Sequence, residues 1–479
     1  MEYEAIIGME VHAQVLTRSK MFCGCSADYA SAPANTHTCP VCLALPGVLP
    51  VINRAAVEAT VLTGLALSCT IPPFTKFDRK NYTYPDLPKG YQISQYDYPL
   101  CVGGHLDVQV AGESRRIGIR RVHLEEDTAK LTHTPDGSLI DFNRAGVPLM
   151  EIVTEADIRS ADEAHAYLTE LRTILRYLGV SSGDMERGAM RCEANVSLRP
   201  RGARAFGTKV EIKNLNSFRS VRSAIVYEID RQSGLLASGG TVEQVTMGWD
   251  EERQCTVFQR SKEYAEDYRY FPEPDLPPIE MTPVEVQTIR ERLPELPHDK
   301  AQRYEREFGI KSADVALLVA EHPTALFYEQ AVAARPALAQ AIANWMLGEV
   351  FRYLSEGERT TAELPISPAM LAELVALVDD GTINNTVGKQ VLNEMMTSGE
   401  AAASIVERRG LAQISDTVAL EQIITSVVAQ HPGPVAQYRE GESKVLGFLI
   451  GQAMRATQGK ANVQIVRDLL LQALDDSQR

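Results

Sequence analysis

Four segments of the sequence alternate apolar and polar residues with the two-residue period of a β-strand. They cover residues 3–15, 119–127, 190–198 and 208–215. In each segment the apolar residues fall on one face, while the other face carries a glutamate beside His, Arg, Lys or Asn. Sheets with one apolar and one polar face are commonly antiparallel. The pattern therefore predicts an antiparallel sheet whose apolar face is covered by helices.

The shared polar face of these strands is the candidate site. Its residues are Glu10, His12, Gln14, Arg121, His123, Glu125, Arg191, Glu193, Asn195, Lys209, Glu211 and Lys213. Carboxylate oxygens and a neutral imidazole suit a magnesium–nucleotide site, with the basic residues on the phosphates. For any one strand, an ordinary solvated face with cross-strand ion pairs explains the pattern as well. Four such faces in one chain favour a catalytic surface.

Familiar phosphate-binding loops do not occur in the sequence. It has no Gly-x4-Gly-Lys-Ser/Thr motif, and the nearest stretch, residues 183–188, lacks the lysine and the hydroxyl residue. A dinucleotide-binding glycine fingerprint after a strand is missing too. If the chain uses ATP, we expect the nucleotide to lie on the antiparallel sheet.

Four of the eight cysteines lie close together, as Cys23-Gly-Cys25 and Cys39-Pro-Val-Cys42. Four soft ligands at this spacing favour a structural zinc site, with His37 as a spare ligand. The alternative is four packed or redox-sensitive thiols. The other cysteines are isolated in the sequence and are predicted to be small core residues: Cys69, Cys101, Cys192 and Cys255.

Proline divides the chain. Residues 272–297 are too rich in proline to continue a helix or a central strand. Short alternating segments precede them, and Ala- and Leu-rich stretches with helical spacing follow, as at Leu371, Leu374, Val375 and Val378. We expect an α+β fold with three domains: a catalytic domain at 1–292, an all-α helical domain at 293–405 and a small helical tail at 406–479.

Charge restricts how the chain can bind anions. Its 48 Lys and Arg against 63 Asp and Glu give a net charge of −15, so an anionic partner must meet a local basic patch. Residues 199–222 hold seven basic residues and one acid, and the loop 76–85 mixes cations with aromatic residues, which suits nucleotides or single-stranded RNA. Within the tail, residues 438–467 hold two acids and five basic residues that suit phosphate-backbone contact: Arg439, Lys444, Arg455, Lys460 and Arg467.

The compartment follows from two absences in the sequence. No apolar run approaches the roughly 18 residues of a membrane span, and the first residues lack a basic region and a cleavage site. We therefore expect a cytoplasmic protein without a membrane partner, in which the cysteines are mostly reduced.

Several long motifs resemble one family closely. They are Gly8–Gln14 (GMEVHAQ), Asp78–Tyr82 (DRKNY), Tyr84–Gln95 (YPDLPKGYQISQ), His123–Asp127 (HLEED), Asn143–Leu149 (NRAGVPL), Glu211–Ser217 (EIKNLNS), Arg260–Glu263 (RSKE), Gly447–Gln452 (GFLIGQ) and Gly459–Asn462 (GKAN). Over essentially its whole length the chain resembles the GatB subunits of the aspartyl/glutamyl-tRNA(Asn/Gln) amidotransferases. Two departures stand out: Thr128-Ala129 replaces the usual Ala-Gly, and Gly441-Glu-Ser-Lys444 has one positive charge fewer than the usual pattern, which predicts weaker contact of the tail with tRNA.

The resemblance implies a carbon–nitrogen ligase of three subunits that converts Glu-tRNA(Gln), Asp-tRNA(Asn) or both to the amide. A glutaminase subunit supplies ammonia from glutamine, a third subunit is small, and the GatB subunit phosphorylates the side-chain carboxylate with ATP and Mg²⁺ before ammonia displaces phosphate. A non-discriminating aminoacyl-tRNA synthetase is a further candidate partner. The implied N-terminal fold is a cradle related to glutamine synthetase and the guanidino kinases.

The resemblance also implies roles for individual residues. It implies magnesium ligation by His12, Glu125 and Glu151, and nucleotide binding by Glu10, Arg191, Glu193, Asn195 and Glu211. Glu10, Glu125 and Glu211 are the predicted catalytic carboxylates, and Lys209 and Lys213 are the predicted cationic clamp on the phosphates.

Two other functions are compatible with parts of the sequence. A non-catalytic scaffold that binds tRNA explains the basic stretches, but an RNA-facing sheet would not gather carboxylates without metal ions. A zinc hydrolase that uses His12 explains the cysteines less well, because four cysteine ligands leave no open coordination position on the zinc.

Overall fold

The computed structural model describes residues 2–261, 268–412, 417–457, 461 and 463–476. The chain divides into two compact units, Met1–Pro297 and His298–Arg479. The expected three-domain division, with boundaries at 292 and 405, stays a prediction. Among the described helices, none combines the length and the apolar character that crossing a bilayer requires.

A nine-stranded sheet forms the centre of the first unit. Its strand order is β14-β13-β12-β11-β1-β10-β7-β5, and β6 also pairs with β7. The strands are β1 (Tyr3–Gln14), β5 (Cys101–Val102), β6 (His105–Val110), β7 (Glu113–Glu126), β10 (Pro148–Thr154), β11 (Met190–Pro200), β12 (Val210–Leu215), β13 (Val245–Asp250) and β14 (Cys255–Ser261). The chain's first strand, β1, therefore lies inside the sheet and pairs antiparallel with both β10 and β11.

The predicted antiparallel arrangement is confirmed for most pairs and is wrong for one. β12 and β13 run parallel, with Glu211 opposite Thr246. The helix α3 (Phe218–Ala237) lies between these two strands in sequence. Parallel neighbours need such a crossover, and the alternation within residues 208–215 carries no information about the direction of the next strand.

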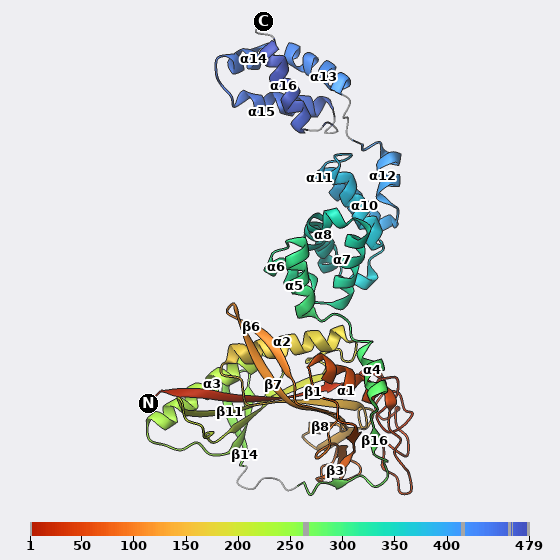
Figure 1. Ribbon diagram of the computed structural model, residues 1–479, viewed down its shortest axis with the longest axis vertical. Coiled ribbons are helices and arrows are strands. Elements are labelled where there is room, and N and C mark those ends of the chain that lie inside the picture. Colours follow the sequence, from red (N-terminus) through yellow and green to blue (C-terminus); the bar gives the residue numbers. More distant parts are fainter. Residues whose placement is uncertain (1, 262–267, 413–416, 458–460, 462, 477–479) are drawn as a thin grey trace. The chain divides into compact units, whose positions relative to one another are not determined.

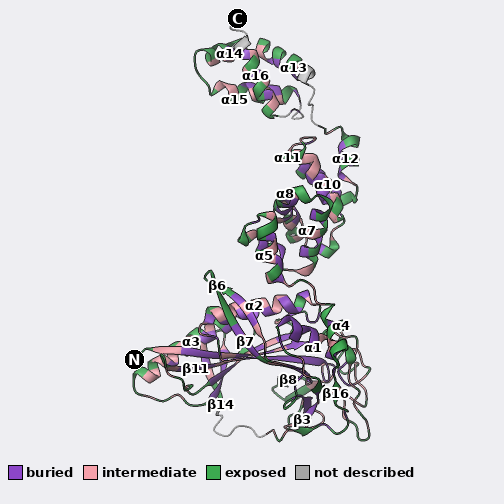
Figure 2. Ribbon diagram, in the orientation of Figure 1, coloured by how far each residue is buried: buried purple, intermediate pink, exposed green. Residues whose placement is uncertain are grey.

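Helices cover the apolar face of the sheet, as expected. Figure 1 shows α2 (Ala161–Tyr177) and α3 along one side of the strands, with α1 (Arg54–Ala66) near β7. The odd-numbered residues Ile7, Met9 and Val11 of β1 are fully buried in this core together with Tyr167 of α2. Figure 2 shows the buried residues concentrated in the sheet and on the inner sides of these helices. The predicted strand faces are therefore confirmed.

The proline-rich segment stays on the first unit. Its β15 (Phe271–Pro272) pairs with β3 (Asp78–Asn81), which also pairs with β4 (Tyr91–Ser94). Its β16 (Ile279–Glu280) pairs with β2 (Phe74–Thr75), and α4 (Pro283–Arg290) follows. Short edge strands and the first turn of a helix are positions that tolerate proline. A separate hairpin, β8 (Lys130–Thr134) and β9 (Gly137–Asp141), lies on the same unit.

The second unit is helical in its described residues. It contains α5 (Pro297–Phe308), α6 (Ser312–Leu318), α7 (His322–Ala334), α8 (Ala339–Trp345), α9 (Phe351–Glu356), α10 (Pro368–Asp379), α11 (Asn385–Ser398), α12 (Ala402–Arg409), α13 (Thr417–Gln430), α14 (Pro432–Arg439), α15 (Val445–Ala456) and α16 (Val463–Asp476). One hydrophobic cluster runs from Tyr304 to Val406 and a second from Leu420 to Leu474. The helical spacing predicted at 371–378 is confirmed, since Leu371, Leu374 and Val375 of α10 are buried.

Candidate active site and cysteine cluster

Four neighbouring strands place a row of polar residues on one face of the sheet. Arg191 of β11 lies opposite His12 of β1, His12 lies opposite Glu151 of β10, and Glu151 lies opposite His123 of β7. Residues directly opposite one another in antiparallel strands share a face, with Cβ atoms about 5 Å apart. The strand pairing alone therefore brings these four side chains together from distant parts of the sequence.

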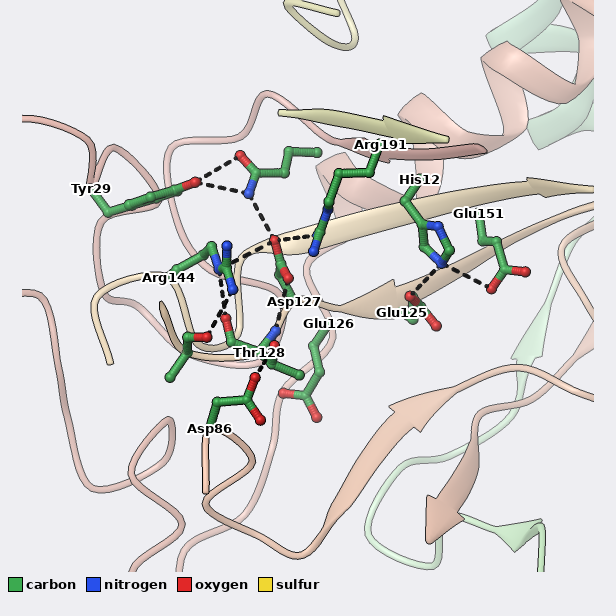
Figure 3. Close-up of polar contacts among 12 residues, drawn as sticks. His12, Tyr29, Asp86, Glu125, Glu126, Asp127, Thr128, Arg144, Glu151 and Arg191 are labelled. Carbon is green, nitrogen blue, oxygen red and sulfur yellow. Dashed lines mark hydrogen bonds and ion pairs between the residues drawn. The ribbon is translucent and has the colours of Figure 1, made fainter. Parts of the chain in front are cut away.

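The centre of the row can hold a cation. The Nε2 atom of His12 lies 3.5 Å from Glu151 Oε2 and 3.6 Å from Glu125 Oε1, and Figure 3 shows the imidazole between the two carboxylates. One ligand atom each from His12, Glu125 and Glu151 lies within 4.8 Å of the others. Ser94 Oγ donates a hydrogen bond of 3.1 Å to Glu125 and fixes its orientation. This is the metal set implied by the family resemblance.

The charges in the row depend on one another. Burial alone would lower the pKa of His12, but the Glu151 and Glu125 carboxylates outweigh it and raise that pKa to about 9. Burial would raise the pKa of Glu151, but His123 and His12 outweigh it and hold that pKa well below its usual range. The carboxylates of Glu125 and Glu151 thus favour positive charge between them, and a bound cation would supply that charge.

A second group of acids lies beside the row. Glu10 lies opposite Glu193, and Asn195 lies opposite Glu211. Asn195 donates a hydrogen bond of 2.9 Å to Glu10, and Thr246 donates one of 2.7 Å to Glu211. Burial, together with the charges of Glu151 and Glu193, raises the pKa of Glu10. A cation bound near Glu10 would therefore stabilise the ionised form of its carboxylate.

A cavity of about 520 Å³ opens next to Glu10. Asn195 and Lys209 contribute to its wall, and Gly8 and Phe206 are among the other lining residues. Lys209 is exposed, whereas Lys213 donates a hydrogen bond of 2.7 Å to Glu193. The two predicted clamp residues thus differ: Lys209 faces the cavity, and Lys213 already neutralises a carboxylate.

Lys80 is a site residue that the strand analysis did not identify. It lies on β3, with its Nζ 4.8 Å above the ring of Tyr268. Burial would lower the pKa of Lys80, but the negative charges of Glu125 and Glu151 outweigh it and raise that pKa. The sequence signals at this position were the mixture of cations and aromatic residues in the loop 76–85 and the motif Asp78–Tyr82.

Arg191 reaches a buried carboxylate next to the row. Its Nη2 lies 2.8 Å from Asp127 Oδ2, and Gln14 Nε2 donates a hydrogen bond of 2.8 Å to the same oxygen. Figure 3 shows Arg144 on the other side of Asp127. The hydroxyl of Tyr29 donates a hydrogen bond of 3.2 Å to Gln14 Oε1. Asp127 ends the alternating segment 119–127 and shares the parity of Glu125, but the strand analysis did not single it out, because its partners Arg144 and Arg191 come from other parts of the chain. Nucleotide binding by Arg191 stays a prediction.

The four clustered cysteines meet in space. Their Sγ atoms lie within 4.8 Å of one another, and those of Cys39 and Cys42 are 3.9 Å apart. The edge of a tetrahedron of sulfur atoms around zinc is about 3.8 Å, given a Zn–S bond of about 2.3 Å. A hydrogen bond from Cys23 lowers the pKa of Cys42 to about 4, and the backbone N–H of Cys39 also contributes. The donor set and its spacing fit zinc.

The remaining predicted ligands and cysteines differ in their environments. Within the described part of the chain, His37 stays outside the group of cysteine ligands. Cys69, Cys101 and Cys192 are buried, as predicted. The prediction that Cys255 is a core residue is wrong: it is only half-buried, because it begins β14 at the edge of the sheet.

The predicted tRNA-binding residues of the tail are exposed where the structure describes them. Arg439 ends α14, Lys444 precedes α15, Arg455 lies on α15 and Arg467 on α16. Lys460 lies outside the described residues. Their exposure makes these side chains accessible to an RNA backbone, and their role stays a prediction.

Comparisons with known proteins place the chain in one family. Residues 5–287 match the family described as the GatB/GatE catalytic domain, and residues 326–474 match the family described as the GatB domain. The GatB subunit of the aspartyl/glutamyl-tRNA(Asn/Gln) amidotransferase of Thermomicrobium roseum is 54% identical over 478 residues, 99% of each chain. Its counterpart in Moorella thermoacetica is 52% identical over 99% of this chain and all of its own length. The protein therefore belongs to the family of GatB subunits of the aspartyl/glutamyl-tRNA(Asn/Gln) amidotransferases.

Proposed function

We propose that this chain activates the side-chain carboxylate of a misacylated Glu-tRNA(Gln) or Asp-tRNA(Asn) with ATP and presents it to ammonia. The observation that carries the proposal is the possible metal-binding group of His12, Glu125 and Glu151 on the sheet, together with the cavity beside Glu10. Membership of the GatB family, over 99% of the chain, supports the same reaction.

The residue types suit the chemistry of this reaction. An oxygen of the substrate carboxylate attacks the γ-phosphorus, the bond to ADP breaks, and an acyl phosphate forms. Ammonia then attacks the carbonyl carbon, and phosphate leaves with the electron pair of the C–O bond. Both steps bring anions together, so positive charge must be fixed in place before the reaction.

We assign the binding roles from the geometry. His12, Glu125 and Glu151 would hold Mg²⁺, which would neutralise negative charge on the phosphates. The cavity beside Glu10 and Asn195 would hold the nucleotide, with Lys209 at its phosphates. Lys80, whose charge interacts with those of Glu125 and Glu151, would attract the substrate carboxylate. Glu193 and Glu211 complete the acidic surface around the nucleotide.

Three further roles belong to the same proposal. The four cysteines would hold a structural zinc ion, because tetrahedral sulfur ligation leaves no open position for a substrate. The exposed basic residues of the tail would contact the tRNA backbone. A separate glutaminase would supply ammonia, and a small third subunit would complete a heterotrimer in the cytoplasm, where aminoacyl-tRNA is used.

Reconstitution tests the proposal. The chain is combined with its two partner subunits, ATP, glutamine and each mischarged tRNA, and both ADP release and amide formation are measured. We expect ADP release that depends on this chain and on the mischarged tRNA. A scaffold without chemistry would instead allow amide formation to continue after Glu125→Gln, and that result would refute the assignment of the carboxylates.

A further inference from the structure

Lys20 is the lysine with the most unusual environment in the described residues. Its side chain is among the largest that are fully buried, with 0% of its surface exposed. Lysine is almost never fully buried unless a partner compensates its charge. The surroundings of its ammonium group therefore need an explanation.

The Nζ atom of Lys20 has three acceptors. It donates hydrogen bonds of 2.8 Å to the carbonyl oxygen of His37 and 3.2 Å to that of Phe142, and it lies 3.6 Å from Cys42 Sγ. The two carbonyl groups are neutral. The sulfur of Cys42 is the acceptor among these three that can carry a full negative charge, and it belongs to the cysteine cluster.

We propose that Lys20 is a positioning residue of the metal centre, which donates an N–H···S hydrogen bond to Cys42 and compensates the charge of the loaded cluster. Four thiolates around one divalent cation leave two negative charges, and the cluster is partly buried. A buried ammonium at hydrogen-bond distance from one thiolate removes half of that excess. This inference rests on the zinc site proposed above.

A second buried residue provides the matched control. Asn143 accepts a hydrogen bond of 2.7 Å from the backbone N–H of His37 and donates one of 2.7 Å to the carbonyl oxygen of Pro33. It is fully buried, like Lys20, and fastens the same loop. These hydrogen bonds go to the backbone of the loop and not to a cysteine sulfur. Asn143→Ala therefore loosens the loop without removing charge from the cluster.

The experiment uses the full-length chain with zinc and, separately, with Co²⁺ in its place. We measure zinc content, the rate of zinc transfer to a chromogenic chelator, and the energy of the sulfur-to-cobalt charge-transfer band. For Lys20→Met we expect zinc transfer about 10 to 100 times faster and a shifted band, because the thiolate loses its hydrogen bond. For Asn143→Ala we expect the band at its wild-type position.

A second variant separates the loss of the charge of Lys20 from the loss of the hydrogen bonds that hold the loop. Lys20→Gln keeps N–H donors for the carbonyl groups but has no charge, so it should shift the band in the same direction as Lys20→Met. If Lys20 only tethers the loop, its variants and Asn143→Ala will share one band position, and the inference is overturned. Zinc-free wild-type protein would overturn the zinc site and this inference together, whereas a zinc-loaded wild type with an unshifted Lys20 variant would overturn this inference alone.

Discussion

The guanidinium of Arg191 is tied to the buried carboxylate of Asp127, with 2.8 Å between Nη2 and Oδ2. Burial would raise the pKa of Asp127, but Arg191 and Arg144 outweigh it and lower that pKa from its ordinary value of 3.8. An acid whose pKa is lowered by folding stabilises the folded state above its ordinary pKa, and this contribution disappears as the pH falls through the lowered value. The pair therefore holds Arg191 at one end of the active-site row, and its contribution to the stability of the folded state is complete near neutral pH.

Asp127→Asn should lower the free energy of unfolding by about 2 kcal/mol at pH 7, the order expected for a hydrogen bond to a charged group. The difference from wild type should shrink as the pH falls below about 4, since the wild-type carboxyl then becomes protonated, first in the unfolded state and then in the folded state. Urea denaturation at pH 7, 5 and 3.5 measures this. Asp162→Asn is the control, because Asp162 pairs with Arg222 on the surface, where such pairs contribute roughly 0–1 kcal/mol. A loss for Asp127→Asn that does not vary with pH would contradict the electrostatic explanation.

Glu125→Gln and Glu10→Ala should abolish tRNA-dependent ADP release and amide formation in the reconstituted enzyme. The first removes charge from the proposed metal set and the second removes the acid beside the cavity. Ammonia production from glutamine should survive in part, because we place that reaction on another polypeptide. The control is Glu4→Gln. Glu4 lies on β1, on the same face as Glu10, and forms an ion pair with Arg199. Full amidation by either active-site variant, with Mg²⁺ dependence unchanged, would refute the metal assignment.

The two predicted clamp lysines should behave differently. Lys209 is exposed and lines the cavity, so Lys209→Met should raise the KM for ATP about tenfold, which corresponds to about 1.4 kcal/mol for one charge-assisted contact. Lys213 is already neutralised by Glu193, and Lys213→Met should change this KM less than Lys209→Met does. Steady-state ADP release at saturating tRNA measures both. The opposite order of effects would mean that Lys213 turns from Glu193 to the nucleotide on binding.

The tail should contribute affinity for tRNA and little to the chemical step. Replacing Arg439, Lys444, Arg455 and Arg467 by Gln should raise the KM for tRNA strongly and lower its salt dependence, since each phosphate contact adds about one to the salt slope. The rate at saturating tRNA should change much less. Arg335→Gln, an exposed arginine of the same unit outside the tail, is the control. Unchanged tRNA affinity in the fourfold variant would mean that the tail's charges are only solvated.

A truncation that tests the same point should end after Ala412. A truncation at the expected domain boundary, after residue 405, would cut through α12. Ile405 and Val406 of this helix are buried in the hydrophobic cluster that runs from Tyr304 to Val406, and Leu411 packs against the same cluster. A shorter chain would therefore lose stability as well as the tail, and the two effects on tRNA binding could not be separated.

Strand alternation predicted the part of the site that lies on regular strands. His12, Glu193 and Glu211 were identified because each stands between apolar neighbours in its own alternating segment, and Glu125 because it follows Leu124 and shares the parity of His123. Alternation could not identify Lys80, which lies on β3, the short middle strand of a separate three-stranded sheet. It did not single out Asp127 either, although Asp127 shares the parity of Glu125, because its partners Arg144 and Arg191 come from other parts of the chain. For the same reason it could not show that Lys20 contacts Cys42, since that contact depends on how the loop of residues 20–42 folds back.

The position of β1 inside the sheet has a consequence for biosynthesis. Tyr3 pairs with Pro200, and Gln14 pairs with Leu149, so β1 leaves the ribosome well before the strands that pair with it. At the usual pace of translation, roughly 10 to 40 seconds separate Gln14 from Pro200. During this time the apolar face of β1 is exposed to chaperones and to other nascent chains, and His12 has no Arg191 opposite it. A chain terminated before β10 would therefore carry no partial active site, only an unpaired first strand.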